Sequence, residues 1–215
     1  MMNRREFSLG ASALGLGLAG PALAQAPQYK EGKNYLKLNK PAPTRSPAGK
    51  VEVVEFFGYF CPHCNTFDPT LNAWLKSPAA PAQMAFRRVP VNFDPRMIPG
   101  QKLYYALEGL GQIDALHSAA FRSVHVERKP LESDAQVFDW ATRNGLDLSK
   151  FKEAYNSFSV ANQVRQATQL QEAYRVEGVP SMGVAGRYYI DGGTAGGMPQ
   201  MLQVVSHLVG QAAKG

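Results

Sequence analysis

One segment sets the architecture expected for this chain: Phe56-Phe57-Gly58-Tyr59-Phe60-Cys61-Pro62-His63-Cys64. It holds the only two cysteines among 215 residues, and two positions separate them. A C-x-x-C pair that follows an apolar β-type run and opens a helical pattern is typical of a redox-active dithiol. We therefore expect Cys61 and Cys64 to carry the chemistry of the chain.

The residues on either side of the pair predict a strand followed by a helix. Residues 51–57 are rich in β-branched and aromatic side chains, as expected for a buried central strand. After Pro62, apolar side chains recur three or four positions apart, at Phe67, Leu71, Trp74 and Leu75. Pro62 suits the first helical turn, where its missing N–H has no partner to lose. Cys61 is thus expected at a helix N-terminus, where free N–H groups and the helix dipole stabilise a thiolate.

Three other uses of a C-x-x-C pair fit the sequence less well. A structural zinc site needs a second pair of soft ligands, whereas His117, His125 and His207 are scattered without ligand spacing. Covalent haem attachment needs a histidine directly after the second cysteine, and Asn65 stands there. A purely structural disulfide across so short a loop would constrain little of the unfolded chain. We expect no metal ion, and no cofactor besides the redox-active disulfide of the pair.

The first 24 residues have the pattern of an export signal. Arg4-Arg5 precede Phe7, a weakly apolar run follows, and Ala22-Leu23-Ala24 offers a cleavage site. The apolar run is shorter than the ~20 residues that span a bilayer. The Arg-Arg-x-Phe order resembles a twin-arginine signal, and an ordinary secretory signal stays open as the alternative. We predict cleavage of residues 1–24 and export of a soluble protein to a bacterial periplasm.

The charge of the chain argues against a nucleic-acid partner. The sequence has 23 basic and 17 acidic residues, and removing residues 1–24 takes away two arginines and one glutamate. The excess that remains is typical of a solvated surface. The basic doublet of the globular region, Arg87-Arg88, is not part of a patch with interleaved aromatic residues. Proteins of an oxidising compartment often contain structural disulfides. This chain has only two cysteines, and we expect them to carry out its function.

The rest of the chain predicts an α/β unit interrupted by helices. Strand patterns stand at 35–38, 84–89 and 181–190, the last as a hairpin, with helical patterns at 100–176 and 198–209. Within the helical region, Ser133 and Ser149 are predicted as N-caps.

The predicted fold class is α/β with an inserted all-helical domain, and the family resemblance described below implies that the α/β part is a thioredoxin fold. About 190 mature residues exceed a minimal thioredoxin-like unit. We assign residues 28–97 and 165–215 to the thioredoxin-like domain. Residues 98–164 form the predicted helical insert.

Two motifs together resemble the DsbA family of periplasmic thiol:disulfide interchange proteins. They are E-F-F-x-x-x-C-P-H-C, from Glu55 to Cys64, and the turn Gly178-Val179-Pro180. The resemblance implies an enzyme that donates its disulfide to newly exported, unfolded proteins. It also implies reoxidation by a DsbB-like, quinone-linked membrane partner, and we expect a monomer. Asn39 departs from the family, which often has an acidic residue at this position, and this leaves the oxidising power open.

Each motif residue receives a predicted role. Cys61 is the nucleophile and exchange centre, and His63 stabilises its thiolate by a hydrogen bond or by charge. Cys64, one turn into the helix, is less accessible and acts as the resolving thiol. The resemblance places Pro180 beside the dithiol with a cis peptide bond, and lets the backbone of Val179 pair with an extended substrate.

Glu55 has two interpretations. A glutamate at the end of a strand is usually solvated. The family resemblance instead makes it a buried proton acceptor near Cys64 that also tunes the thiolate. We favour the second interpretation, in which Glu55 is buried.

Alternative functions stay open at this stage. A disulfide reductase or isomerase of the same fold would use the same pair, although isomerases usually need a dimerisation domain and few mature residues precede the central strand. A chaperone or other binding module would keep its function without the two cysteines. A glutathione-dependent isomerase of small molecules shares the fold, but the C-P-H-C motif and the export signal argue against it. The predicted function is a thiol oxidase.

Overall fold

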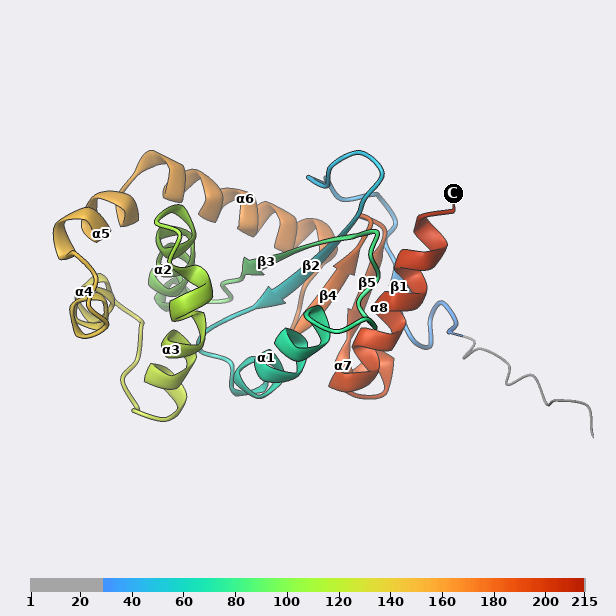
Figure 1. Ribbon diagram of the computed structural model, residues 1–215. Helices are drawn as coiled ribbons and strands as arrows, with labels where there is room; N and C mark the ends of the chain where they lie inside the picture. The colour runs from blue at the N-terminus through green and yellow to red at the C-terminus, as the bar shows by residue number, and fades with distance from the viewer. Residues whose placement is uncertain (1–28, 215) are drawn as a thin grey trace, which may run out of the picture.

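The computed structural model describes residues 29–214 and contains a mixed five-stranded sheet (Figure 1). The strands are β1 Leu36–Lys37, β2 Val51–Phe57, β3 Met84–Pro90, β4 Ser181–Val184 and β5 Tyr188–Asp191. Their order in the sheet is β1-β5-β4-β2-β3. β2 runs parallel to β3 and antiparallel to β4, and all of its residues are buried. The strand that leads to the cysteines is therefore covered on both faces, as its composition predicts.

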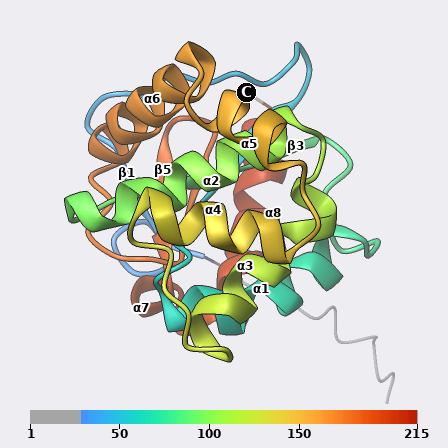
Figure 2. The ribbon, with the colours of Figure 1, turned by 90° about the vertical axis from the view of Figure 1, so that its left-hand side faces the viewer.

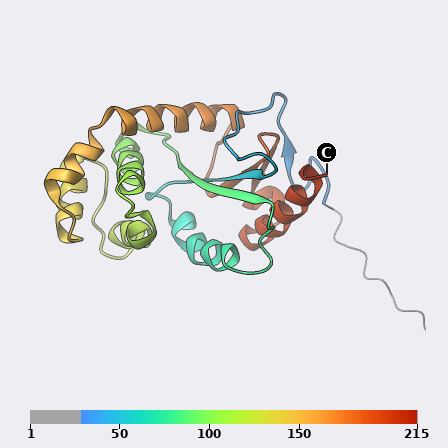
Figure 3. The same ribbon diagram turned by 45° about the horizontal axis from the view of Figure 1, so that its top comes forward.

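Helices lie on both faces of the sheet. One face carries α1 Pro62–Leu75, α7 Gly192–Ala195 and α8 Met198–Ala212. The other face carries α6 Phe158–Tyr174. Figure 3 shows the sheet between α6 on one side and α1 with α8 on the other. This three-layer arrangement, with α1 starting where β2 ends, positions the dithiol at the edge of the core.

The remaining helices form a layer beside the sheet, between β3 and β4 in the chain (Figures 1 and 2). They are the 3₁₀ helix η1 Pro95–Met97, then α2 Ile98–Gly109, α3 Ile113–His125, α4 Asp134–Arg143 and α5 Leu148–Tyr155. α6 starts in this layer and runs back along the sheet (Figure 1). The predicted division between residues 164 and 165 falls inside α6, so this helix is shared by the two parts.

β2 contributes to a core on each face. Its residue Val53 packs with Phe67 of α1 and with α8, whereas Val54 and Phe56 belong to the cluster that includes Tyr174 of α6. This alternation follows from the two-residue period of a strand. Each fully buried side chain of this size contributes ~1.5–3 kcal/mol relative to an exposed one. Both cores therefore hold β2, and with it the start of α1, in place.

One of the two predicted helix caps is confirmed and the other is wrong. Ser133 caps α4, because its hydroxyl accepts a hydrogen bond from the N–H of Gln136 at 3.3 Å. α5 is capped by Asp147 instead of Ser149. The Asp147 carboxylate accepts from the N–H groups of Ser149 and Lys150 at 3.0 and 3.1 Å. One carboxylate thus satisfies two free N–H groups, which a hydroxyl two positions later cannot reach.

The first described residues lie against the last helix, α8. The described chain starts at Tyr29, whose hydroxyl donates to Gln203 on α8 at 3.1 Å. The predicted export signal, residues 1–24, lies outside the described residues. Among residues 29–214, no helix combines the length and the apolar character needed to cross a membrane.

Candidate active site

Cys61 is the N-cap residue of α1, as predicted. Its backbone is extended, and Pro62 occupies the first helical position. The Cys61 sulfur accepts a hydrogen bond from the N–H of Cys64 at 3.4 Å, the bond that a capping oxygen usually makes. The same sulfur lies 3.2 Å from the carbonyl oxygen of Val179. Both cysteines are free thiols, so the structure represents the reduced pair.

The two thiols have opposite electrostatic environments. A hydrogen bond from the side chain of Cys64 lowers the pKa of Cys61 to about 6, against the effect of burial. The backbone N–H groups of Cys64 and His63 and the charge of the His63 imidazole lower it further. Burial raises the pKa of Cys64 far above its ordinary value, and the hydrogen bond to Cys61 adds to this. The proton of the pair therefore stays on Cys64, and Cys61 carries the negative charge near neutral pH.

The Val179–Pro180 loop lies directly beside Cys61. Its peptide bond is cis, as predicted. Val179 is half-buried and Pro180 is buried, and both line a groove of about 1180 Å³ together with His63 and Asn39. Apolar and charged side chains form its walls, among them Leu36, Leu38, Lys40, Arg175, Tyr189 and Met198. The fold thus brings His63 of the dithiol helix and the Val-Pro turn together in the wall of one groove.

Glu55 is buried, so its interpretation as a solvated charge at the end of a strand is wrong. Its carboxylate accepts a hydrogen bond from Nε of Arg88 at 2.8 Å. Burial raises the pKa of Glu55 to about 7, and the nearby charge of Asp68 raises it as well, whereas Arg88 opposes the shift. The charge of Glu55 in turn raises the pKa of Cys64. Glu55 therefore has the burial and the proton affinity that a proton acceptor near Cys64 needs.

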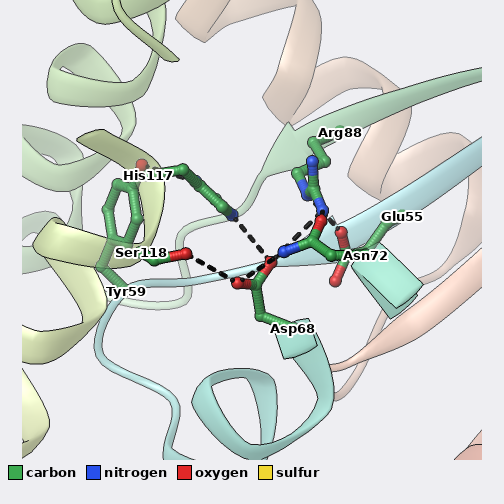
Figure 4. A network of polar contacts seen from close by, with 7 residues as sticks. All are labelled: Glu55, Tyr59, Asp68, Asn72, Arg88, His117 and Ser118. Carbon is green, nitrogen blue, oxygen red and sulfur yellow. Dashed lines mark hydrogen bonds and ion pairs between the residues drawn. The ribbon is translucent and has the colours of Figure 1, made fainter. Parts of the chain in front are cut away.

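Three residues around Glu55 were missed by the sequence interpretation (Figure 4). Arg88, considered there only as part of a basic doublet, is half-buried and points to two carboxylates. His117, taken as an isolated histidine, lies between Tyr59 and Asp68. Asp68 is a buried carboxylate on the apolar face of α1. That charged position within an otherwise apolar helical stripe is the one signal in the sequence that could have revealed the cluster.

The chain is similar to known proteins over most of its length. A family model described as a DSBA-like thioredoxin domain matches residues 85–208. The chain is 40% identical over 207 residues to the thiol:disulfide interchange protein DsbA of Bordetella pertussis, with 96% of each protein covered. It is 39% identical over 186 residues to the protein of the same name from Pseudomonas aeruginosa, covering 86% of this chain and 87% of that one.

The similarity extends to three-dimensional structure. A crystal structure of Pseudomonas aeruginosa DsbA matches with a TM-score of 0.80 at 38% sequence identity. The match covers 87% of this chain and 97% of the other. The two proteins therefore share one fold over most of their length.

Proposed function

This chain belongs to the DsbA family of thioredoxin-like thiol:disulfide oxidoreductases, and from that premise we propose that it donates the Cys61–Cys64 disulfide to newly exported proteins. The observation that carries the proposal is the opposite environment of the two sulfurs at the start of α1. Reduction of the disulfide ends in a stabilised Cys61 thiolate. A pair with a favoured reduced form gives up its disulfide readily.

The proposed reaction is two successive thiol–disulfide exchanges. A substrate thiolate attacks the Cys61 sulfur, the Cys61–Cys64 bond breaks, and Cys64 leaves as a thiolate that takes up a proton. A second substrate thiolate then attacks the substrate sulfur of the mixed disulfide. Cys61 leaves as a thiolate, which its low pKa favours. The substrate loses two electrons in forming its disulfide, and the two cysteines gain them.

The residues around the sulfurs hold the reactants in place. Pro62 starts the helix whose free N–H groups face the Cys61 sulfur, and His63 adds its imidazole at the exposed rim of the groove. Val179 and Pro180 line the same groove, beside the Cys61 sulfur. An extended substrate lying in this groove would pair with the backbone of Val179.

Glu55 is the proposed proton acceptor for Cys64. Cys64 is protonated in the reduced pair, and it must lose this proton whenever it attacks a mixed disulfide at Cys61. Of the described carboxyl groups, Glu55 has a pKa of about 7 and acts electrostatically on Cys64. A base with a pKa near the working pH transfers protons most effectively in both directions.

The proposal extends to the surroundings of the enzyme. It acts in a bacterial periplasm after removal of residues 1–24, as a monomer and with no cofactor besides its disulfide. Unfolded exported proteins are its substrates. A DsbB-like, quinone-linked membrane protein returns the cysteines to the disulfide. The similarity to the DsbA proteins of Bordetella and Pseudomonas supports this setting.

The redox equilibrium of the pair tests the proposed direction of electron flow. We expect a strongly oxidising disulfide in a glutathione buffer, and thiolate absorbance of Cys61 with a midpoint near pH 6. Because the folded pKa lies below the ordinary value of 9.0, the thiolate stabilises the reduced form fully above that value, and this gain is lost as the pH falls through about 6. A reducing pair with an ordinary thiol would contradict the proposal and favour a reductase.

The division of roles between the cysteines has its own test. Cys61→Ser should abolish oxidation of a reduced, unfolded substrate protein. Cys64→Ser should instead accumulate mixed disulfides, visible on non-reducing gels, because the resolving thiol is missing. Normal turnover by the Cys61→Ser protein would show that the assignment is wrong.

A further inference from the structure

A buried cluster of charges connects the dithiol helix with α3 of the helical layer (Figure 4). Two carboxylates, Glu55 and Asp68, share the guanidinium of Arg88 at 2.8 and 3.2 Å. Their side chains are 2% and 5% exposed. One cation thus faces two buried anions, an arrangement in which one of the anions is expected to hold a proton.

The two carboxylates differ in the donors that they receive. Among the described residues, Glu55 accepts a hydrogen bond from Arg88 alone. Asp68 has four polar partners, of which three donate hydrogen bonds and the fourth is the imidazole of His117. On Oδ1 these are Arg88 at 3.2 Å and Nε2 of His117 at 3.4 Å, and on Oδ2 they are Asn72 at 2.9 Å and Ser118 at 3.2 Å. Two of the four, His117 and Ser118, come from α3.

The protonation of His117 is set by its two neighbours. Its Nδ1 lies 2.9 Å from the hydroxyl of Tyr59, and burial raises the pKa of that phenol, so the hydroxyl donates and Nδ1 accepts. Nε2 then carries the ring hydrogen and faces Asp68. Burial also lowers the pKa of His117, which favours this neutral form. Arg88, Asp68 and Asp114 act electrostatically on Glu55 or His117. Glu55 in turn acts on Tyr59, Tyr104 and Cys64.

We infer that His117 and Ser118 are positioning residues that hold Asp68 in its charged form. The proton that the cluster exchanges with Cys64 is thereby confined to Glu55. This inference rests on the proposed role of Glu55 only for its consequence at Cys64; the distribution of the proton between the two carboxylates stands on the contacts alone. The helical layer, which supplies neither cysteine and no part of the Val-Pro turn, thus takes part in the acid–base chemistry of the pair.

Carbon-13 NMR titration of the carboxyl groups in the reduced mature protein tests the inference directly. Glu55→Gln and Asp68→Asn assign the two signals. In the unmodified protein we expect the Glu55 signal to titrate near pH 7 and the Asp68 signal to stay that of a carboxylate. The test variant is His117→Phe, which keeps a ring but removes the donor. Thr142→Ala, which removes a hydroxyl from α4 away from the cluster, is the matched control.

The expected result is a redistribution of one proton. Loss of a hydrogen bond to a charged group should move the proton ratio between Asp68 and Glu55 by roughly tenfold toward Asp68. Both signals then titrate with a shared midpoint. Ser118→Ala should act in the same direction by a smaller factor. His117→Gln, which restores an N–H donor, should return the ratio toward that of the unmodified protein.

Several outcomes would overturn the inference. It fails if the Asp68 carboxyl signal does not titrate in the His117→Phe protein. It also fails if Thr142→Ala redistributes the proton as much as His117→Phe does. If His117→Phe does not fold, an unchanged Asp68 signal in the Ser118→Ala protein has the same meaning. The rate of Cys64 alkylation against pH separates this result from the proposed function. An unchanged profile in Glu55→Gln would remove the proton-acceptor role, whatever the distribution of the proton.

Discussion

Two buried ion pairs stand on opposite faces of β2 and differ in how the anion is held. Glu52 and Glu55 are each 2% exposed. Glu52 accepts two hydrogen bonds from Arg87, at 3.0 and 3.3 Å, and one from the N–H of Arg45 at 2.8 Å. Glu55 accepts one, from Arg88, whose guanidinium also serves a second carboxylate.

The contrast shows that equal burial does not give equal chemistry. The pKa of Glu55 is raised to about 7, because burial outweighs its single hydrogen bond and a second anion lies close by. A glutamate on a buried strand therefore becomes a candidate proton acceptor when its cation is divided between two anions. Glu52 is the internal reference, because it lies on the same strand, is equally buried and pairs with an arginine of its own.

Arg88→Met should produce the largest effect. It leaves two buried carboxylates without their cation, which typically costs about 3–5 kcal/mol of the free energy of unfolding. Because ionised carboxylates in this position repel each other, we expect a larger loss at about pH 8 than at about pH 5. Denaturant unfolding of the reduced protein at both pH values measures it. An equal loss at the two values would mean that Arg88 acts through packing and not through charge.

Exchanging each glutamate for glutamine should give opposite signs. The folded pKa of Glu55 lies above its ordinary value of 4.5, so its ionisation costs stability as the pH rises from 4.5 to about 7. Glu55→Gln removes this cost. As the pH rises through that window, the free energy of unfolding of the variant should increase by about 3 kcal/mol relative to that of the unmodified protein. Glu52→Gln loses well-made hydrogen bonds and should be less stable by about 1–3 kcal/mol at pH 7. If the free energies of unfolding of the two variants changed with pH in the same way, the proposed difference between Glu52 and Glu55 would be wrong.

Arg87→Met should have the smallest effect of the series. The Arg87 side chain is 26% exposed, and Glu52 keeps the N–H of Arg45 when the guanidinium is lost. We expect a loss of about 1–2 kcal/mol in the free energy of unfolding. The measurement is the same denaturant titration. If Arg87→Met lowered the free energy of unfolding as much as Arg88→Met, stability would not depend on the number of carboxylates that each arginine contacts.

The parts of this molecule that depend on near neighbours could be predicted from the sequence. The bounds of β2 match the predicted strand, and α1 begins at Pro62 as expected. The Ser133 cap is likewise decided within one helical turn. The cis peptide bond before Pro180 came from the family resemblance, because an X-Pro pair in a turn does not identify its own isomer.

The polar cluster could not be predicted, because distant pairings create it. Arg88 reaches Glu55 only because the register of β2 and β3 places the two residues opposite each other. His117 reaches Asp68 only because α3 packs against α1 (Figure 4). Neither register nor packing is encoded by spacing within a segment. The short helix α7 was missed for a different reason, because it consists of a single turn. A capping box of Asp191 and Thr194 stabilises its N-terminus.

The strand order has a consequence for how the protein is made. β2 lies between β3 and β4, and β4 is synthesised only after the whole helical layer has left the ribosome. Cys61 and Cys64 therefore emerge long before Val179 and Pro180, the turn that faces them. Long-range strand pairing of this kind is slow, and the growing chain leaves its apolar surfaces uncovered meanwhile. The thiols of the growing chain therefore stay uncovered until about the last sixth of the polypeptide has been made. During synthesis the enzyme thus exposes free thiols in an unfolded chain, as do the substrates that we propose for it.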